Sequence, residues 1–134
     1  MYRSLLPCIF ILAIAGCALP PERQALQPLP ENGPPHPFID LVGRARTQAS
    51  VANEAFYVNN WVDLEDAAKA LELTARALTR AKEIPAQHRD KLAVEAGDLG
   101  QDAVVLREAA KAKEVKQTNE ALQRINLKIR ELRP

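Results

Sequence analysis

Few side chains of this chain are spaced for chemistry. A nucleophile needs an adjacent base and an orienting group, and the only imidazole bases are His36 and His88. His36 lies in a proline-rich stretch, where we expect it to be solvated. His88 follows Pro85 in a polar connection, and we expect it to be an exposed loop residue. We therefore predict no catalytic residue and no enzymatic activity.

Metal and phosphate sites are not predicted either. Metal sites in helical bundles use inward Glu and Glu-x-x-His pairs, but no His follows a Glu by three positions. The stretch Gly97–Gly100 lacks the lysine and the preceding strand of a phosphate-binding loop. Asp98 and Asp102 share a helix face, where we expect a solvated pair. With a net charge of +1, no overall field indicates nucleic acid, and we expect no cofactor.

Cys17 has the most informative surroundings. A positively charged start is followed by about a dozen apolar residues, too short a run to span a bilayer as a helix, and this run ends in Ile14-Ala15-Gly16-Cys17. The ending resembles the lipobox of bacterial lipoprotein signal peptides. That resemblance implies that the Cys17 thiol is lipidated with a diacylglyceryl group, that residues 1–16 are removed, and that the new amino terminus is acylated. The alternative is an ordinary secretory signal or a short membrane anchor.

The resemblance also implies a location in the cell envelope. The other cysteine, Cys8, follows Leu6-Pro7, a poor lipobox, and would be discarded with the signal peptide. The mature chain would then have no thiol left for a disulfide. Where the residue after the cysteine directs sorting, Ala18 rather than Asp favours the outer membrane, with the protein facing the periplasm.

Residues 17–37 are expected to be a linker. Seven of the ten prolines lie in residues 18–37, and proline disfavours both helix and sheet. We predict a disordered, partly polyproline spacer, with an ordered arm lying on the domain as the alternative. At about 3.1 Å per residue, such a spacer would reach roughly 60 Å.

Residues 38–134 are expected to form an all-α domain. Hydrophobic residues make up 47% of the chain and aromatic residues only 4%, a composition typical of helices rich in Ala and Leu. Apolar residues recur at alternating three and four positions, which predicts helices that face other helices. The four expected seams are Phe38, Val42, Ala45, Ala49, Ala52 and Phe56; Trp61, Leu64, Ala68, Leu71, Ala75 and Leu78; Leu92, Ala96, Leu99, Ala103, Leu106 and Ala110; and Val115, Thr118, Leu122, Ile125, Ile129 and Leu132.

The breaks between these seams predict the topology. Asn59-Asn60 is suited to a turn and a cap, and Pro85 is expected to stop the second helix. The seams before and after Lys111–Glu114 are out of phase, which favours a turn there over one helix from 86 to 132. Gly97 and Gly100 indicate either close approach to a neighbouring helix or a late helix start near Gln101. We predict an antiparallel up-down-up-down four-helix bundle.

This domain also resembles the cytochrome c-prime type of four-helix bundle. The resemblance rests on Trp61-Val62-Asp63-Leu64, on Leu106-Arg107-Glu108-Ala109-Ala110 and on the closing Leu132-Arg133-Pro134. It implies the same fold. In that family the last helix carries C-x-x-C-H for haem, but the corresponding residues 125–129 contain neither Cys nor His. The haem site therefore does not carry over.

Two features remain as candidates for binding. The aromatic residues Phe56, Tyr57 and Trp61 flank the first turn and either plug the end of the core or bind a partner. Residues 107–134 carry a local charge of about +4, which indicates pairing with the acidic earlier helices or attraction to anionic lipid. We expect a membrane-anchored lipoprotein that presents a structural or protein-interaction module to an unknown protein partner. The alternatives are a ligand-binding or non-covalent haem-binding bundle and an accessory subunit of an envelope enzyme.

Overall fold

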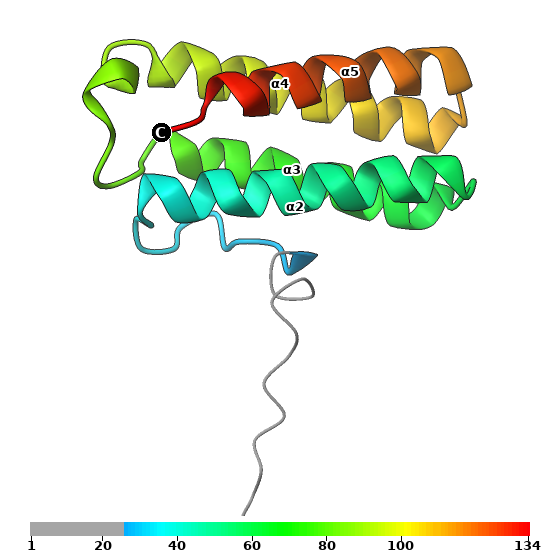
Figure 1. The fold of residues 1–134 in the computed structure, drawn as a ribbon. Helices are drawn as coiled ribbons and strands as arrows, with labels where there is room; N and C mark the ends of the chain where they lie inside the picture. Colours follow the sequence, from blue (N-terminus) through cyan, green and yellow to red (C-terminus); the bar gives the residue numbers. More distant parts are fainter. Residues whose placement is uncertain (1–25) are drawn as a thin grey trace, which may run out of the picture.

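The computed structural model describes residues 26–134, and these form an all-α fold, as predicted (Figure 1). The signal peptide and Cys17 lie outside the described residues. Four long helices and one short 3-10 helix follow one another, and no strand is present in the described part. Their bounds are α2 Phe38–Tyr57, α3 Trp61–Leu78, η1 Ala86–His88, α4 Leu92–Ala112 and α5 Val115–Glu131.

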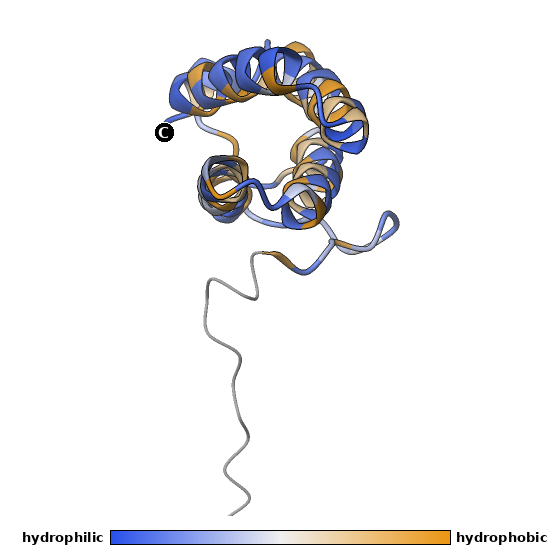
Figure 2. Ribbon diagram, turned by 90° about the vertical axis from the view of Figure 1, so that its right-hand side faces the viewer, coloured by the Kyte–Doolittle hydropathy of each residue, from blue (hydrophilic) through white to orange (hydrophobic). Residues whose placement is uncertain are grey.

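The four helices form a bundle in which each helix packs against two neighbours. Figure 1 shows α2 and α3 in one layer and α4 and α5 in the other, with consecutive helices running in opposite directions. Contacts join α2 to α3, α3 to α4, α4 to α5, and α5 back to α2. Seen end-on, the helices surround one shared interior (Figure 2). The connections 58–60 and 113–114 are short, as is typical of antiparallel neighbours, whereas residues 79–91 form a longer connection between α3 and α4.

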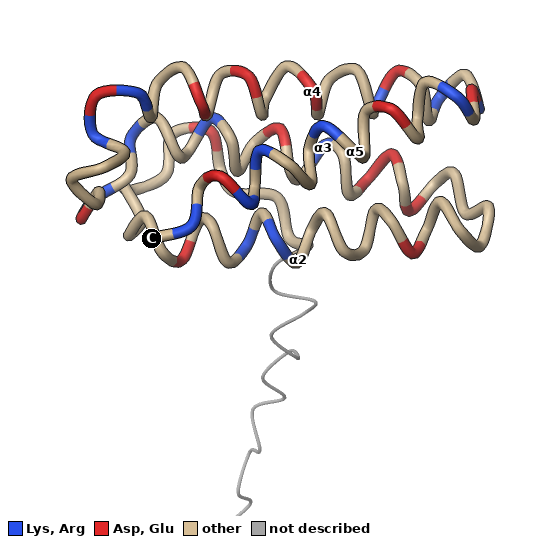
Figure 3. Tube along the Cα trace, turned by 45° about the horizontal axis from the view of Figure 1, so that its top comes forward, with Lys and Arg blue, Asp and Glu red and all other residues tan. Residues whose placement is uncertain are grey.

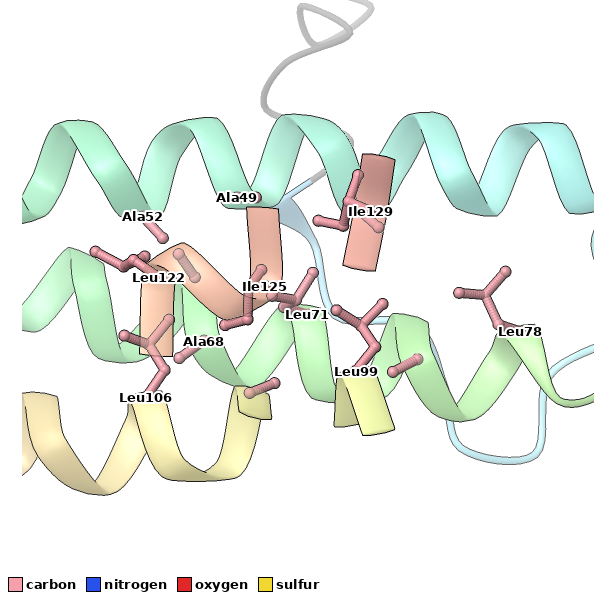
Figure 4. Packing of buried hydrophobic residues seen from close by; sticks show 14 of the residues in the cluster. Ala49, Ala52, Ala68, Leu71, Leu78, Leu99, Leu106, Leu122, Ile125 and Ile129 are labelled. Carbon is pink, nitrogen blue, oxygen red and sulfur yellow. The ribbon is translucent and has the colours of Figure 1, made fainter. Parts of the chain in front are cut away.

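The bundle interior is filled by leucine and isoleucine against alanine. Leu71, Leu99 and Ile125 are fully buried and come from three different helices (Figure 4). Alanines such as Ala49 and Ala68 let the helix axes approach closely, while the larger side chains fill the space between them. Nearly all of the predicted seam residues are buried. The exceptions are Phe56 and Trp61, which are half-buried, and Val115, which is exposed.

The predicted turns after α2 and α4 are both present. Asn59 adopts a left-handed conformation with φ 56°, and the Asn60 side chain caps α3 by accepting a hydrogen bond from the Asp63 N–H at 3.2 Å. Lys113 is also left-handed and ends α4. The prediction of a hairpin over a single helix across 86–132 is therefore confirmed, although neither Gly nor Pro marks the turn.

The start of α4 decides between the two interpretations of Gly97 and Gly100, which were a late helix start and close approach to a neighbouring helix. Because α4 begins at Leu92, the late start near Gln101 is wrong. A Cβ placed on Gly100 would lie 3.5 Å from the Ala75 Cβ, so α4 approaches α3 closely at this position. A Cβ on Gly97 would meet nothing within 4 Å, so close approach does not explain that glycine.

The second helix ends earlier than predicted. Pro85 was expected to stop it, but α3 ends at Leu78. Lys82 is then held in an isolated parallel bridge with Pro37. The Phe38 N–H donates to the Lys82 carbonyl at 2.8 Å, and the Lys82 N–H donates to the His36 carbonyl at 2.9 Å. This pairing takes the backbone of Lys82 out of helical geometry before the chain reaches the proline.

Residues 26–37, called the arm below, lie against the bundle. Leu29 packs on the hydrophobic core, and Glu31 forms an ion pair with Arg76 of α3 at 3.1 Å. The prediction of a disordered spacer therefore does not describe this half of residues 17–37, where the alternative of an ordered arm holds. The physical reason is that the arm contributes an apolar side chain and a carboxylate that α3 can bind. Residues 17–25 lie outside the described part.

Candidate functional site

The end of the bundle formed by residues 56–62 brings together the three aromatic residues singled out from the sequence. The Phe56 and Trp61 rings meet edge to face, with centroids 6.1 Å apart. The Phe56 and Tyr57 rings are tilted, with centroids 6.3 Å apart. Capping by Asn60 sets the turn that lets Trp61 fold back onto Phe56. The cluster is thus built by the turn between α2 and α3.

These three residues do not play the same structural part. Phe56 and Trp61 are half-buried and pack against the core, as expected for residues that close the end of a bundle. Tyr57 is 83% exposed. Its neighbours Val58 and Val62 are also exposed, at 65% and 70%. We call Tyr57, Val58 and Val62 the turn patch, because all three flank the turn and present apolar surface to solvent.

Another exposed apolar residue lies at the same end. Val115 begins α5 directly after the turn at 113–114, and it is 59% exposed. Figure 1 shows this turn and the α2–α3 turn at the same end of the bundle. The sequence prediction that Val115 belongs to the seam is wrong, because the first residue of α5 projects past the end of the core. Single exposed apolar residues are common, whereas several at one end indicate an interaction surface.

His88 occupies a different position from the one predicted. It was expected to be an exposed loop residue, but only 3% of it is exposed. Its ring stacks on Phe38 with centroids 5.2 Å apart. Nδ1 lies 3.1 Å from a Glu95 carboxylate oxygen, and Nε2 lies 2.8 Å from the Arg133 carbonyl. His88 therefore ties the α3–α4 connection to the start of α2, to α4 and to the C-terminus.

The contacts of His88 hold separate parts of the chain together. Both ring nitrogens already have partners within the protein, and the ring face is covered by Phe38. No nucleophilic side chain is among these contacts. The sequence signal that could have indicated the burial of His88 is Pro85, since Pro85 precedes the 3-10 turn that directs His88 inward.

The acidic pair Asp98 and Asp102 is also placed differently. Asp102, expected to be solvated, is only 8% exposed. It accepts a hydrogen bond from Arg124 Nε at 2.7 Å, while Asp98 lies 3.5 Å from Lys128 Nζ. These bonds join α4 to α5, and Figure 3 shows the acidic positions of α4 beside basic positions of α5. Pairing between helices, predicted from the uneven charge distribution, is thereby confirmed.

A second charged cluster was missed from the sequence. Glu72 of α3 is buried and accepts from Arg107 of α4 at 2.6 Å and from Arg76 at 2.7 Å. The Arg76 contact has the i, i+4 spacing that the sequence contains. The Arg107 contact depends on how α3 and α4 meet, and no spacing along the chain indicates it.

A shallow cleft lies where the arm crosses α3. It has a volume of about 370 Å³ and is lined mainly by polar groups, including Glu31, Arg76 and Arg80. Arg80 donates to the Glu31 carbonyl at 2.7 Å. Both guanidinium groups therefore contact the arm, and Arg76 also pairs with Glu72. Within residues 26–134, no group of three or more His, Cys, Asp or Glu is placed to hold a metal ion.

Comparison with known proteins finds no match to a family model, to a curated protein or to a solved structure. Among the helices of residues 26–134, none is long and apolar enough to cross a membrane. The candidate sites therefore rest on the chain's own geometry. Cys17 lies outside the described residues, and the turn patch is the candidate for binding a partner.

Proposed function

We propose that this protein is a non-enzymatic lipoprotein of a bacterial cell envelope that presents its helical bundle as a protein-interaction module. Cys17 carries the lipid, and the outer membrane is the proposed site, facing the periplasm. The observation that carries the interaction role is the turn patch, in which Tyr57, Val58 and Val62 are each more than half exposed. Aromatic and apolar side chains of this kind anchor protein interfaces.

The anchor is supported by the lipobox-like ending at Ile14–Cys17. One acyl chain gives only marginal membrane binding, whereas two or more anchor a protein stably, at about 0.8 kcal/mol per buried CH₂. A triacylated Cys17 would hold the bundle without help from its surface. Metabolic labelling with radioactive palmitate should label the wild type and not Cys17→Ala. An unlabelled wild type, or equal label in both, would remove the anchor from the proposal.

The interaction role has its own test. A photo-cross-linking amino acid at position 57 should capture a discrete partner in intact cells, while the same group at the exposed Gln101 of α4 should not. Val62→Asp should abolish the cross-link, because a carboxylate at the patch disfavours apolar docking. Equal capture from positions 57 and 101, or capture that survives Val62→Asp, would exclude the turn patch as the binding surface.

A further inference from the structure

The arm lies at a defined position on the bundle, beside α2 and α3. A guanidinium nitrogen of Arg44 donates to the Gln27 carbonyl, which places residue 27 beside α2. Arg76 and Arg80 then hold Glu31 beside α3. Figures 1 and 2 show the arm along the outer side of the layer formed by α2 and α3, away from α4 and α5. We call this outer side of α2 and α3 the arm face.

The arm also shortens the tether between the bundle and Cys17. Only eight residues, 18–25, lie between Cys17 and Leu26, and the nine steps from Cys17 to Leu26 span at most about 32 Å when fully extended. The spacer expected from the sequence would have reached roughly 60 Å. Since α2 with its 20 residues is about 30 Å long at 1.5 Å per residue, the fully extended tether is about as long as one helix of the bundle, and it starts from the arm face.

We infer that the arm face lies against the membrane surface, with lipid head groups as its partner, and that α4 and α5 face away. This inference rests on the proposed anchor at Cys17. The arm face carries Arg44, Arg76 and Arg80, and the Arg76 side chain remains 59% exposed although it is paired. Guanidinium groups bind phosphate through paired hydrogen bonds. The long axis of the bundle then runs along the membrane, so the turn patch meets partners located at the membrane surface.

The chain allows a direct measurement, because it contains one tryptophan and, after residue 16, one cysteine. The chain from Cys17 to Pro134 is coupled through Cys17 to a maleimide lipid in anionic phosphatidylglycerol vesicles that contain dansyl head groups. Trp61→Phe is combined with either Lys69→Trp or Gln101→Trp. Lys69 is exposed on α3 one turn before Leu73, which lines the cleft under the arm, and Gln101 is exposed on α4.

Energy transfer from tryptophan to dansyl should be several-fold stronger from position 69 than from position 101, because two helix layers separate the faces by about 20 Å. Equal transfer, or stronger transfer from position 101, would overturn the inference. Arg76→Gln with Arg80→Gln removes the side chains of α3 that bind Glu31 and should reduce the difference between the two positions, whereas the exposed Arg130→Gln should preserve it. A difference that is undiminished in the double variant would also overturn the inference.

This measurement is independent of how the cell processes the chain. Circular dichroism of each variant, matched to its parent, establishes that the bundle is intact before transfer is compared. Because coupling to the vesicle is chemical, a failure of palmitate labelling would remove the anchor while leaving the measured orientation unchanged. Conversely, equal energy transfer from the two faces would contradict the proposed orientation without contradicting lipidation of Cys17.

Discussion

At one end of the bundle the arm, residues 79–91 and the C-terminus close over the core, while at the other end two short turns leave apolar side chains in solvent. The closed end buries His88 and gives both of its ring nitrogens partners. The open end exposes Tyr57, Val58 and Val62. Ile39 and Val94, in the first turns of α2 and α4, are also exposed near the closed end, at 61% and 65%. The two ends therefore differ mainly in what covers the core, and the exposed aromatic ring of Tyr57 is the reason for proposing the open end as the surface for a partner.

The comparison of the two ends assumes that both are held by the same packed core. Leu71→Asp should destabilise the whole bundle by about 4 kcal/mol or more, since it buries an unpaired carboxylate. Lys69→Asp, at an exposed position of the same helix, is the matched control and should change stability little. Chemical denaturation followed by circular dichroism measures both. A small effect of Leu71→Asp would mean that the interior is not packed as described.

Substitutions at the closed end should lower the free energy of unfolding, whereas substitutions at the open end should change it little. His88→Ala removes the stack on Phe38 and the bonds to Glu95 and Arg133, which should cost about 2 kcal/mol. Tyr57→Ala should stay within about 0.5 kcal/mol, because Tyr57 is exposed. Urea midpoints of the two variants test this directly. Similar losses at both positions would show that the turn patch is a structural element instead.

The smallest effect is expected for the arm. Glu31→Gln breaks an exposed ion pair with Arg76 and should change the free energy of unfolding by about 0.5 kcal/mol or less. Its visible consequence should be faster cleavage of residues 26–37 by proteinase K, because the arm opens more often. Glu131→Gln, at an exposed glutamate of α5, serves as the control. Unchanged cleavage would mean that Arg44 and Leu29 hold the arm without this pair.

Several features followed from local patterns in the sequence. The alternating seams predicted which residues fill the core, since a period of 3.6 places them on one face of each helix. The phase shift after Ala110 predicted the turn at Lys113, and Asn59-Asn60 predicted the first turn and its cap. These signals are readable because each depends on residues within a few positions of one another.

Only the tertiary structure decided the features that depend on distant residues. His88 is buried because Phe38, Glu95 and Arg133 converge on it from three parts of the chain, although its local sequence is polar. The arm is ordered because α2 and α3 together offer its binding groups, although its prolines favour an extended chain. Burial and ion pairing depend on residues that are far apart in the sequence. They are decided only when the packed helices bring those residues together.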